Sequence, residues 1–381
     1  MHAKMPNILS IFGTRPEAIK MAPILNKLAR HPDRFQSRVC VTAQHREMLD
    51  QVLAAFSIRP DYDLDIMRPG QDLFQITASV LQGLKEVIED AAPNLVLVHG
   101  DTTTTMAASL ASFYCGAKVG HIEAGLRTRN KFAPYPEEMN RRITGVIADF
   151  HFAPTPGARA NLVEEKVDPA TIFVTGNTVI DALFSVVAKM EDDVDLRESL
   201  AARFSFLTPG KKLVLVTGHR RENFGEGFRN ICAALAKLAG MHPEIEILYP
   251  VHMNPNVREA VMRILGGAGR SNIHLIEPVD YLPFVYLMNR AYLILTDSGG
   301  IQEEAPSLRK PVLVMRNTTE RPEGVAAGSI RMVGTDVERI CSSISDLISD
   351  PAAYRSMTTA PNPYGDGKAS ERIVSILGEI L

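Results

Sequence analysis

The stretch Ile8-Leu9-Ser10-Ile11-Phe12-Gly13-Thr14-Arg15-Pro16-Glu17 contains the pattern that decides the fold. Its first five residues form a short apolar run, which is typical of a strand buried on both faces. Gly13 permits a tight turn, and Pro16 suits the first position of a helix. The pattern therefore predicts a buried strand that leads directly into a helix. Arg15 and Lys20 could then face a phosphate; a plain turn with a solvated arginine is the alternative.

Similar apolar runs alternate with amphipathic stretches along the rest of the chain. The predicted strands are 8–12, 38–42, 95–98, 118–122, 151–153 and 172–174 in the first half, and 213–217, 245–249, 273–275, 292–295 and 312–314 in the second. Runs that are apolar on both faces and separated by helices indicate parallel sheets. The fold class is therefore α/β, with two Rossmann-type, doubly wound domains over 1–177 and 178–365. A last helix over 366–381 could pack back on the N-terminal domain.

The composition excludes several classes of function. The chain of 381 residues has a formal net charge of −3, so it has no overall basic field to attract nucleic acid. Its four cysteines are far apart in sequence, which argues against a disulfide framework or a zinc site. No stretch reaches the roughly 18–20 apolar residues that span a bilayer, and no signal peptide is recognisable. We therefore expect a cytoplasmic protein without a membrane partner or a bound metal.

Acidic residues follow the predicted strands of the first half. Asp101 comes after the third strand and could either cap the next helix or face a ligand. Glu123 follows the next strand, and Glu137 opens a further helix. Glu137 and Arg141 are spaced i,i+4, as are Glu138 and Arg142, so surface ion pairs are the simpler interpretation of this helix.

The second half carries signals for a nucleotide diphosphate. His219 lies between a strand and a helix beside two arginines, and it could donate to a diphosphate or transfer protons. Ser298-Gly299-Gly300 follows another strand and offers backbone N–H groups at a helix start, which is an anion site. Glu303 or Glu304, one turn further on, could bind ribose hydroxyls. No GxGxxG motif follows a strand, so a nicotinamide dinucleotide is not supported.

Taken together, these motifs resemble the non-hydrolysing UDP-N-acetylglucosamine 2-epimerases. The matching blocks run in order along nearly the whole chain: GTRPEAIK at 13–20, TAQHR at 42–46, VHGDTTT at 98–104, HIEAGLRT at 121–128, PEEMNRR at 136–142, TGNTVIDAL at 175–183, TGHRREN at 217–223, TDSGGIQEEAP at 296–306 and TERPEG at 319–324. Any one block is weak evidence, whereas all of them in order make a specific match.

The resemblance implies a GT-B-like pair of Rossmann-type domains with the nucleotide sugar in the cleft between them, and usually a homodimer. It implies reversible epimerisation of UDP-N-acetylglucosamine (UDP-GlcNAc) to UDP-N-acetylmannosamine (UDP-ManNAc) for bacterial surface polysaccharides, without a cofactor. The catalytic residues by motif are Asp101, Glu123, Glu137 and His219. The positions matching those that hold the UDP-sugar are Arg15, Lys20, Asp101, Glu123, His219, Val279, Phe284, Ser298, Gly299, Gly300, Glu304 and Arg321.

Some members of the family need UDP-GlcNAc at a second, regulatory site. Gln44, Arg68, Arg220 and His252 match positions of that site, while Glu47 stands where such members often have glutamine. The alternatives to an epimerase of this type are a GT-B glycosyltransferase with a UDP-sugar donor, a hydrolysing epimerase that releases N-acetylmannosamine and UDP, and a regulator that only binds the nucleotide sugar. Three acidic residues at strand ends favour chemistry on the sugar ring.

Overall fold

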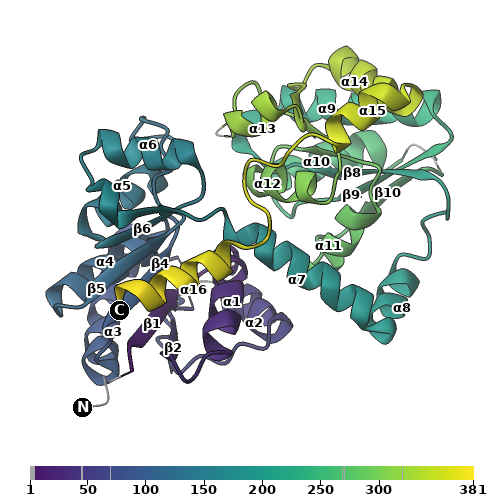
Figure 1. Cartoon of the computed structure of the whole chain (residues 1–381). Coiled ribbons are helices and arrows are strands. Elements are labelled where there is room, and N and C mark those ends of the chain that lie inside the picture. The colour runs from purple at the N-terminus through teal and green to yellow at the C-terminus, as the bar shows by residue number, and fades with distance from the viewer. Residues whose placement is uncertain (1–4, 44–45, 69, 268, 270, 320) are drawn as a thin grey trace. The chain divides into compact units, whose positions relative to one another are not determined.

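The computed structural model describes residues 5–43, 46–68, 70–267, 269, 271–319 and 321–381, without the side chains of Glu47 and Met48. The chain forms two compact units: residues 1–182 with 364–381 make up the first, and residues 183–363 the second. Each unit is a parallel sheet with helices packed against it (Figure 1).

The sheet of the first unit has seven strands in the described part of the chain, in the order β3-β2-β1-β4-β5-β6-β7, and every pairing is parallel. The strands are β1 (Asn7–Phe12), β2 (Gln36–Val41), β3 (Tyr62–Asp63), β4 (Leu95–His99), β5 (Lys118–Ile122), β6 (Phe150–Ala153) and β7 (Ile172–Val174). All residues of β1 and β4, at the centre of the sheet, are buried. Burial of both faces explains their continuous apolar sequence.

The helices of the first unit cover this sheet. They are α1 (Arg15–Ala29), α2 (Arg46–Ala55), α3 (Leu73–Ala91), α4 (Thr103–Tyr114), α5 (Glu137–Ile147), α6 (Pro156–Glu164), a short 3₁₀ turn (Pro169–Thr171), the start of α7 (Thr178–Asp192) and α16 (Ala369–Ile380). α4 packs against α3 and α5, whereas α1 packs against α2 and α16. The carboxylate of Asp181 accepts hydrogen bonds from the backbone N–H groups of Ala369 (3.1 Å) and Ser370 (2.8 Å), which joins α16 to this unit.

The second unit repeats the architecture with six parallel strands among the described residues, in the order β10-β9-β8-β11-β12-β13. They are β8 (Lys212–Thr217), β9 (Ile245–Pro250), β10 (Ile273–Ile276), β11 (Leu293–Thr296), β12 (Val312–Val314) and β13 (Ile330–Met332). The helices are the rest of α7, α8 (Val194–Arg203), a 3₁₀ turn (Arg221–Asn223), α9 (Glu226–Met241), α10 (Pro255–Leu265), α11 (Tyr281–Arg290), α12 (Gly299–Ser307), α13 (Pro322–Ala327), α14 (Val337–Ser349) and α15 (Pro351–Thr358). One apolar core lies between α9, α10, α14 and the strands.

Both sheets reverse their strand order at one point, between β1 and β4 in the first unit and between β8 and β11 in the second. In doubly wound sheets, ligands bind beyond the carboxyl ends of the strands at this reversal, because the connections leave to opposite faces there. The segments that follow these four strands begin at Gly13, Gly100, Gly218 and Asp297. They contain the polar motifs that stand out in the sequence.

The predicted fold class is confirmed, and two local expectations need correction. β3 and β13 form additional edge strands that the sequence pattern did not indicate. Asp101 does not cap α4: Thr102 is the N-cap, and its hydroxyl accepts a hydrogen bond from the N–H of Thr105 (3.1 Å). None of the helices in the described part of the chain combines the length and apolar character that crossing a bilayer requires.

Candidate functional site

Asp101 lies at the carboxyl end of the first sheet, in the loop between β4 and α4. Its carboxylate is 27% exposed and forms an ion pair with the guanidinium of Arg141 on α5. The side-chain amide of Asn140 donates to the backbone carbonyl of Asp101 at 3.0 Å. The first turn of α5 and its neighbouring residues therefore fix both the position and the orientation of this carboxylate.

Glu123 follows β5, and its backbone has a φ of +64°, in the left-handed region that is uncommon for residues other than glycine. Its carboxylate is 9% exposed and forms an ion pair with Lys20 of α1. The side-chain amide of Asn177 donates to the same Glu123 oxygen at 2.8 Å, and Nε2 of His99 lies 3.9 Å from it. A strained backbone that is held by several partners is a common feature of functional sites.

Burial of the imidazole lowers the pKa of His99 to about 4, although the Glu123 charge acts in the opposite direction. His99 is therefore neutral near pH 7, and Lys20 is the neighbouring cation that offsets the charge of Glu123. The structure thus brings Lys20, Asp101 and Glu123 to one edge of the first sheet, around the strand reversal.

Glu137 is the first residue of α5, and one of its carboxylate oxygens is buried without a hydrogen-bond partner among the residues that the structure describes. A buried acceptor without a partner costs free energy, so this oxygen is a candidate to meet a ligand. The surface ion pairs expected on this helix are wrong: Arg141 contacts Asp101 and Glu138, and Arg142 lies 3.8 Å from Glu165.

In the second unit, His219 lies in the loop after β8, and it is held by Asp297, the residue after β11. The buried carboxylate of Asp297 accepts hydrogen bonds from the backbone N–H groups of His219 (3.0 Å) and Arg220 (2.9 Å). Nδ1 of His219 lies 3.3 Å from an oxygen of the same carboxylate, and 41% of the histidine side chain is exposed. Asp297 therefore joins the two segments at the strand reversal of this sheet.

Burial lowers the pKa of His219; Asp297 raises it, while the nearby guanidinium groups of Arg220 and Arg316 and the imidazole of His252 lower it. The ring of His252 stacks on that of His219, with their centroids 5.6 Å apart. Nε of Arg220 is buried and has no hydrogen-bond partner among the described residues.

The start of α12 has the geometry of an anion site. Ser298 is the N-cap, its side chain makes no capping hydrogen bond, and Gly299 and Gly300 are the first two helical residues. The N–H groups at such a start point toward the space beyond β11. On the next turn Glu304 is almost buried, and the hydroxyl of Tyr281 donates to one of its oxygens at 2.9 Å.

The remaining predicted residues lie at the start of α1, at α11 and before α13. Arg321 precedes α13 and forms an ion pair with the buried Glu303. Val279 precedes α11 and Phe284 lies within it, and both are half-buried. Arg15 is the first residue of α1 and is also half-buried.

The residues expected to form a regulatory site are not brought together by one unit. Arg220 and His252 belong to the second unit, beside His219. Arg68 is exposed in the first unit, and its guanidinium donates to the carbonyls of Asp65 and Met67. Gln44 and the side chain of Glu47 lie outside the described residues.

Sequence reasoning missed the partners that orient the candidate carboxylates and the histidine, namely Arg141, Asn177 and Asp297. Asn177 and Asp297 lie in polar blocks just after a strand, and Arg141 lies in the polar block that opens α5; these blocks are the one signal that points to them. Arg141 is 40 residues from Asp101, Asn177 is 54 from Glu123 and Asp297 is 78 from His219, so no local spacing reveals the contacts. Within the described part of the chain, no group of three or more His, Cys, Asp or Glu is placed to hold a metal ion.

The fold and these two groups of residues define a GT-B-like protein; a glycosyltransferase structure from Rickettsia africae, 16% identical with a TM-score of 0.63, shares the fold. More specifically, the chain belongs to the UDP-N-acetylglucosamine 2-epimerase family, whose model matches residues 26–378. It is therefore an enzyme, as the motifs predicted.

Individual relatives match over almost the full length of the chain. UDP-N-acetylglucosamine 2-epimerase of Yersinia pestis is 62% identical over 97% of this chain and 98% of its own, and that of Escherichia coli K12 is 60% identical over the same shares. The crystal structure of the Neisseria meningitidis enzyme bound to UDP-GlcNAc is 52% identical, has a TM-score of 0.91 and covers 98% of this chain and 100% of its own.

The contact with Asp297 gives a testable prediction for His219. In Asp297→Asn the pKa of the imidazole should fall further, because the neighbouring negative charge that stabilises the imidazolium is lost. A titration of histidine signals by NMR in the intact protein measures this. Asp195→Asn, at an exposed position of α8 in the same unit, is the matched control and should leave the signal unchanged. An unchanged His219 titration in Asp297→Asn would show that the carboxylate does not act on the ring.

Proposed function

We propose that this enzyme interconverts UDP-GlcNAc and UDP-ManNAc by eliminating UDP and adding it back, and that the product supplies N-acetylmannosamine units for surface polysaccharides. The observation that supports this most directly is the grouping of Asp101 and Glu123 with Lys20 at one strand reversal, together with the unpartnered oxygen of Glu137. The related Neisseria meningitidis enzyme was crystallised with UDP-GlcNAc, which supports the substrate.

The chemistry of the sugar explains why elimination is the proposed route. The proton at C2 has no neighbouring carbonyl, so its direct removal as a stable carbanion would be very slow. When a base takes this proton while the C1–O bond breaks, the C–H electron pair forms the C1–C2 double bond and the C1–O pair leaves with UDP. The products are 2-acetamidoglucal and UDP. UDP then adds at C1 while a proton is delivered to the opposite face of C2, which inverts that centre.

In this reaction Asp101 acts as the base at C2, and its ion pair with Arg141 holds the carboxylate in place. Glu123 and Glu137 return the proton or stabilise charge on the ring. Lys20 offsets the charge of Glu123.

The second unit holds the leaving group. The hydroxyl of Ser298 and the backbone N–H groups of Gly299 and Gly300 bind the diphosphate as negative charge develops on it, and His219 assists its departure. Glu304, which the hydroxyl of Tyr281 holds by a hydrogen bond, binds the ribose hydroxyls. Arg321, tied to Glu303, adds positive charge near the nucleotide.

The alternatives account less well for these features. A GT-B glycosyltransferase would use the diphosphate site but not three carboxylates grouped in the first unit. A hydrolysing epimerase would release free N-acetylmannosamine, and the relatives that match nearly the whole chain carry the name of the epimerase alone. A binding protein without activity would not need the carboxylates.

The carboxylates can be tested one at a time. Asp101→Asn, Glu123→Gln and Glu137→Gln should each lower kcat by roughly a hundredfold or more, because each removes a group that transfers a proton or stabilises charge. UDP should still bind each variant within a few-fold of the wild-type Kd, measured by calorimetry. Asp33→Asn, at an exposed position between α1 and β2, is the matched control and should keep full activity. Near-normal rates in all three variants would overturn the assignment.

We also propose that UDP-GlcNAc regulates the enzyme through a site in the second unit that includes Arg220 and His252. Stacking of His252 on His219 supports this, because it couples the regulatory residue to the leaving-group residue. The wild type should act slowly on UDP-ManNAc alone and be activated by a trace of UDP-GlcNAc, and His252→Ala should lose this activation. Hyperbolic kinetics with full activity on UDP-ManNAc alone would contradict the proposal.

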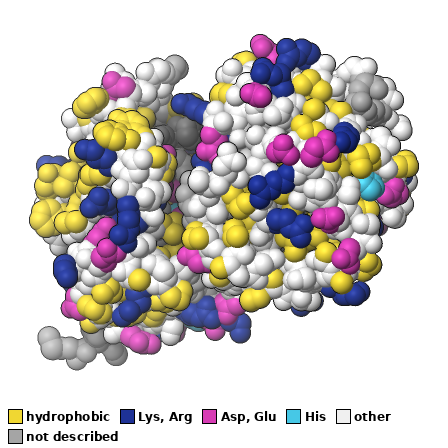
Figure 2. All heavy atoms as spheres, turned by 90° about the horizontal axis from the view of Figure 1, so that it is seen from above, with side chains coloured by type: hydrophobic (Ala, Val, Ile, Leu, Met, Phe, Trp, Pro, Cys, Tyr) yellow, Lys and Arg dark blue, Asp and Glu magenta, His cyan; other side chains and the backbone are white. Residues whose placement is uncertain are grey.

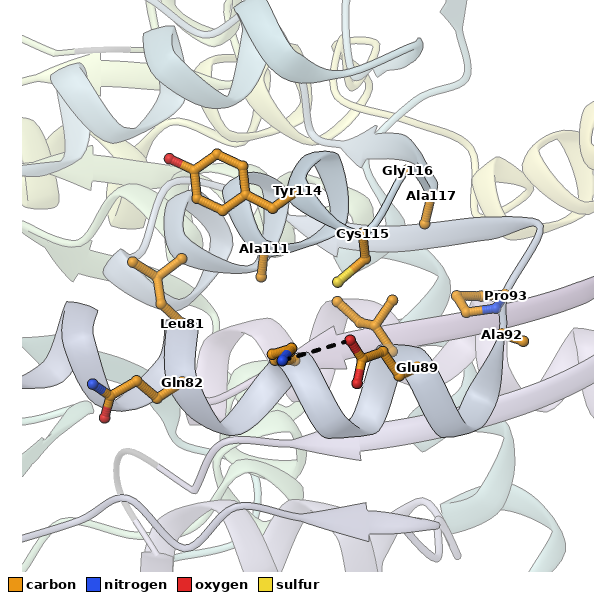
Figure 3. Close-up of a pocket in the computed structure, with 12 residues that line it drawn as sticks. Leu81, Gln82, Glu89, Ala92, Pro93, Ala111, Tyr114, Cys115, Gly116 and Ala117 are labelled. Atoms are coloured by element: carbon orange, nitrogen blue, oxygen red, sulfur yellow. Dashed lines mark ion pairs between the residues drawn. The ribbon is translucent and has the colours of Figure 1, made fainter.

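A homodimer is the assembly that the apolar surface of the first unit supports. Phe113 and Tyr114 at the end of α4 are 64% and 71% exposed, and Val146 on the neighbouring α5 is 87% exposed. Hydrophobic side chains gather at the left edge of Figure 2, the side on which α3, α4 and α5 lie in Figure 1. Tyr114 also lines a pocket of about 740 Å³ between α3 and α4 (Figure 3), where Lys85 and Glu89 form an ion pair. Lys85 and Glu89 lie one helical turn apart, so across a two-fold axis the lysine of each copy can pair with the glutamate of the other.

The replacement Tyr114→Glu should therefore shift the protein from dimer to monomer, because it places a charge within the apolar interface. Sedimentation velocity measures this directly. Met262→Glu, at an apolar position of α10 that is 49% exposed, is the control and should leave the dimer intact. A Tyr114→Glu protein that remains dimeric would exclude this surface.

A further inference from the structure

Glu17, in the first turn of α1, is a buried carboxylate that the proposed reaction does not use. Its side chain is 2% exposed, and burial raises the pKa of the carboxyl while hydrogen bonds to it lower that pKa. Burying a charged group costs free energy unless hydrogen bonds compensate for it, so its contacts show what it does.

The two carboxylate oxygens of Glu17 serve two different loops. Oε2 accepts hydrogen bonds from the backbone N–H groups of Gly13 (3.0 Å) and Thr14 (2.7 Å), in the loop between β1 and α1. Oε1 accepts from the hydroxyls of Thr102 (2.6 Å) and Thr105 (3.0 Å), at the start of α4. A capping box for α1 needs only the first pair. The second pair joins α1 to a segment 85 to 88 residues away in sequence.

The loops are in close contact where Glu17 joins them. A Cβ atom at Gly13 would overlap the hydroxyl of Thr42 and lie 2.7 Å from that of Thr104. Those two hydroxyls are hydrogen-bonded to each other at 3.1 Å. The single hydrogen of the Thr105 hydroxyl is shared between Oε1 of Glu17 and the carbonyl of His99 at the end of β4, which is 2.5 Å away. The junction is therefore a packed network of hydroxyl and backbone groups around the carboxylate of Glu17.

We propose that Glu17 is a positioning residue for the epimerisation: its carboxylate sets the place of the Asp101 loop relative to the helix that carries Arg15 and Lys20. Asp101 is bonded directly to Thr102, so a shift of the α4 start moves the base. Lys20 lies on α1, one turn beyond Glu17, and pairs with Glu123. Glu17 thus controls the distance between two of the three proposed carboxylates without touching the sugar. This inference rests on the proposed function.

The conservative variant Glu17→Gln tests this bridge, by which we mean the hydrogen bonds that link the loop before α1 to the start of α4 through the Glu17 carboxylate. Glutamine keeps the volume, but its amide nitrogen cannot accept a hydrogen bond, so one of the two loops loses its acceptor. Displacement of a reacting group by about 1 Å can cost roughly a hundredfold in rate. We expect kcat to fall ten- to a hundredfold, with KM and the Kd for UDP changed less than threefold, since the proposed contacts of Ser298, Gly299, Gly300 and Glu304 with UDP belong to the second unit.

A matched control separates positioning from helix capping. Gln75 is the equivalent capping-box residue of α3, where its side chain accepts from the N–H of Asp72 at 3.1 Å, and it is exposed. Gln75→Ala removes a cap without removing a bridge, and kcat should stay within twofold of the wild type. Thr105→Val removes a hydrogen bond to Glu17 from the other side while the Thr102 N-cap of α4 stays in place, and it should also lower kcat even if Glu17→Gln does not fold.

Provided that the wild type is active, any of three results would overturn the inference. The first is a kcat within twofold of the wild type in both bridge variants, and the second is a fall in their kcat that is matched by an equal rise in their KM. The third is a fall in kcat of the Gln75→Ala control as large as that of the bridge variants. A wild type that does not interconvert the two nucleotide sugars would instead contradict the proposed function, so the two failures are distinguishable.

Discussion

Parallel sheets in both units reverse their strand order once, and the placement of Asp101 in the first unit and of His219 and Ser298 in the second depends on that constraint. At β1 and β4, and again at β8 and β11, the connecting helices leave to opposite faces of the sheet. The loops that follow these strands therefore meet at a point that helices do not cover. Short polar loops at such a point can present side chains and backbone N–H groups to a ligand, while the fully buried strands behind them keep these groups in place.

The two units use this position for different electrostatic tasks. The first surrounds its carboxylates with matched cations, Lys20 beside Glu123 and Arg141 beside Asp101, so acidic groups can be kept partly buried. The second presents backbone N–H groups at the start of α12 and a histidine held by Asp297. The proposed elimination would use both, because a proton is removed at C2 and negative charge develops on the leaving diphosphate. The two sheets are similar, but their strand-end sequences differ in the way that these two tasks require.

Much of this organisation follows from local sequence. The long buried strands were predictable because burial on both faces requires an unbroken apolar run, as in residues 95–98. β3 has two residues and β13 three, at the edges of their sheets, and such short strands leave no periodic signal. Thr102, not Asp101, caps α4, because either residue type can cap a helix and only the fold decides which lies at its start.

The orienting contacts were harder to predict for a physical reason. Arg141 has a glutamate four residues before it, so its sequence context suggested a local pair; in the fold it reaches across to Asp101, 40 residues away. Glu17 looks like a helix cap in sequence, and half of its hydrogen bonds are of that kind. The other half depend on strand order, which brings α4 beside α1. Contacts of this kind are set by topology, and no local spacing contains them.

In the proposed mechanism the enzyme exchanges the proton at C2 while UDP is eliminated and returned. Proton NMR of the purified protein with UDP-GlcNAc in D₂O, without nicotinamide or an acceptor, is the direct test of this exchange. We expect UDP-ManNAc to appear and deuterium to enter C2 of both nucleotide sugars. Accumulation of UDP and free sugar alone, or a substrate that keeps its C2 proton throughout, would contradict this mechanism.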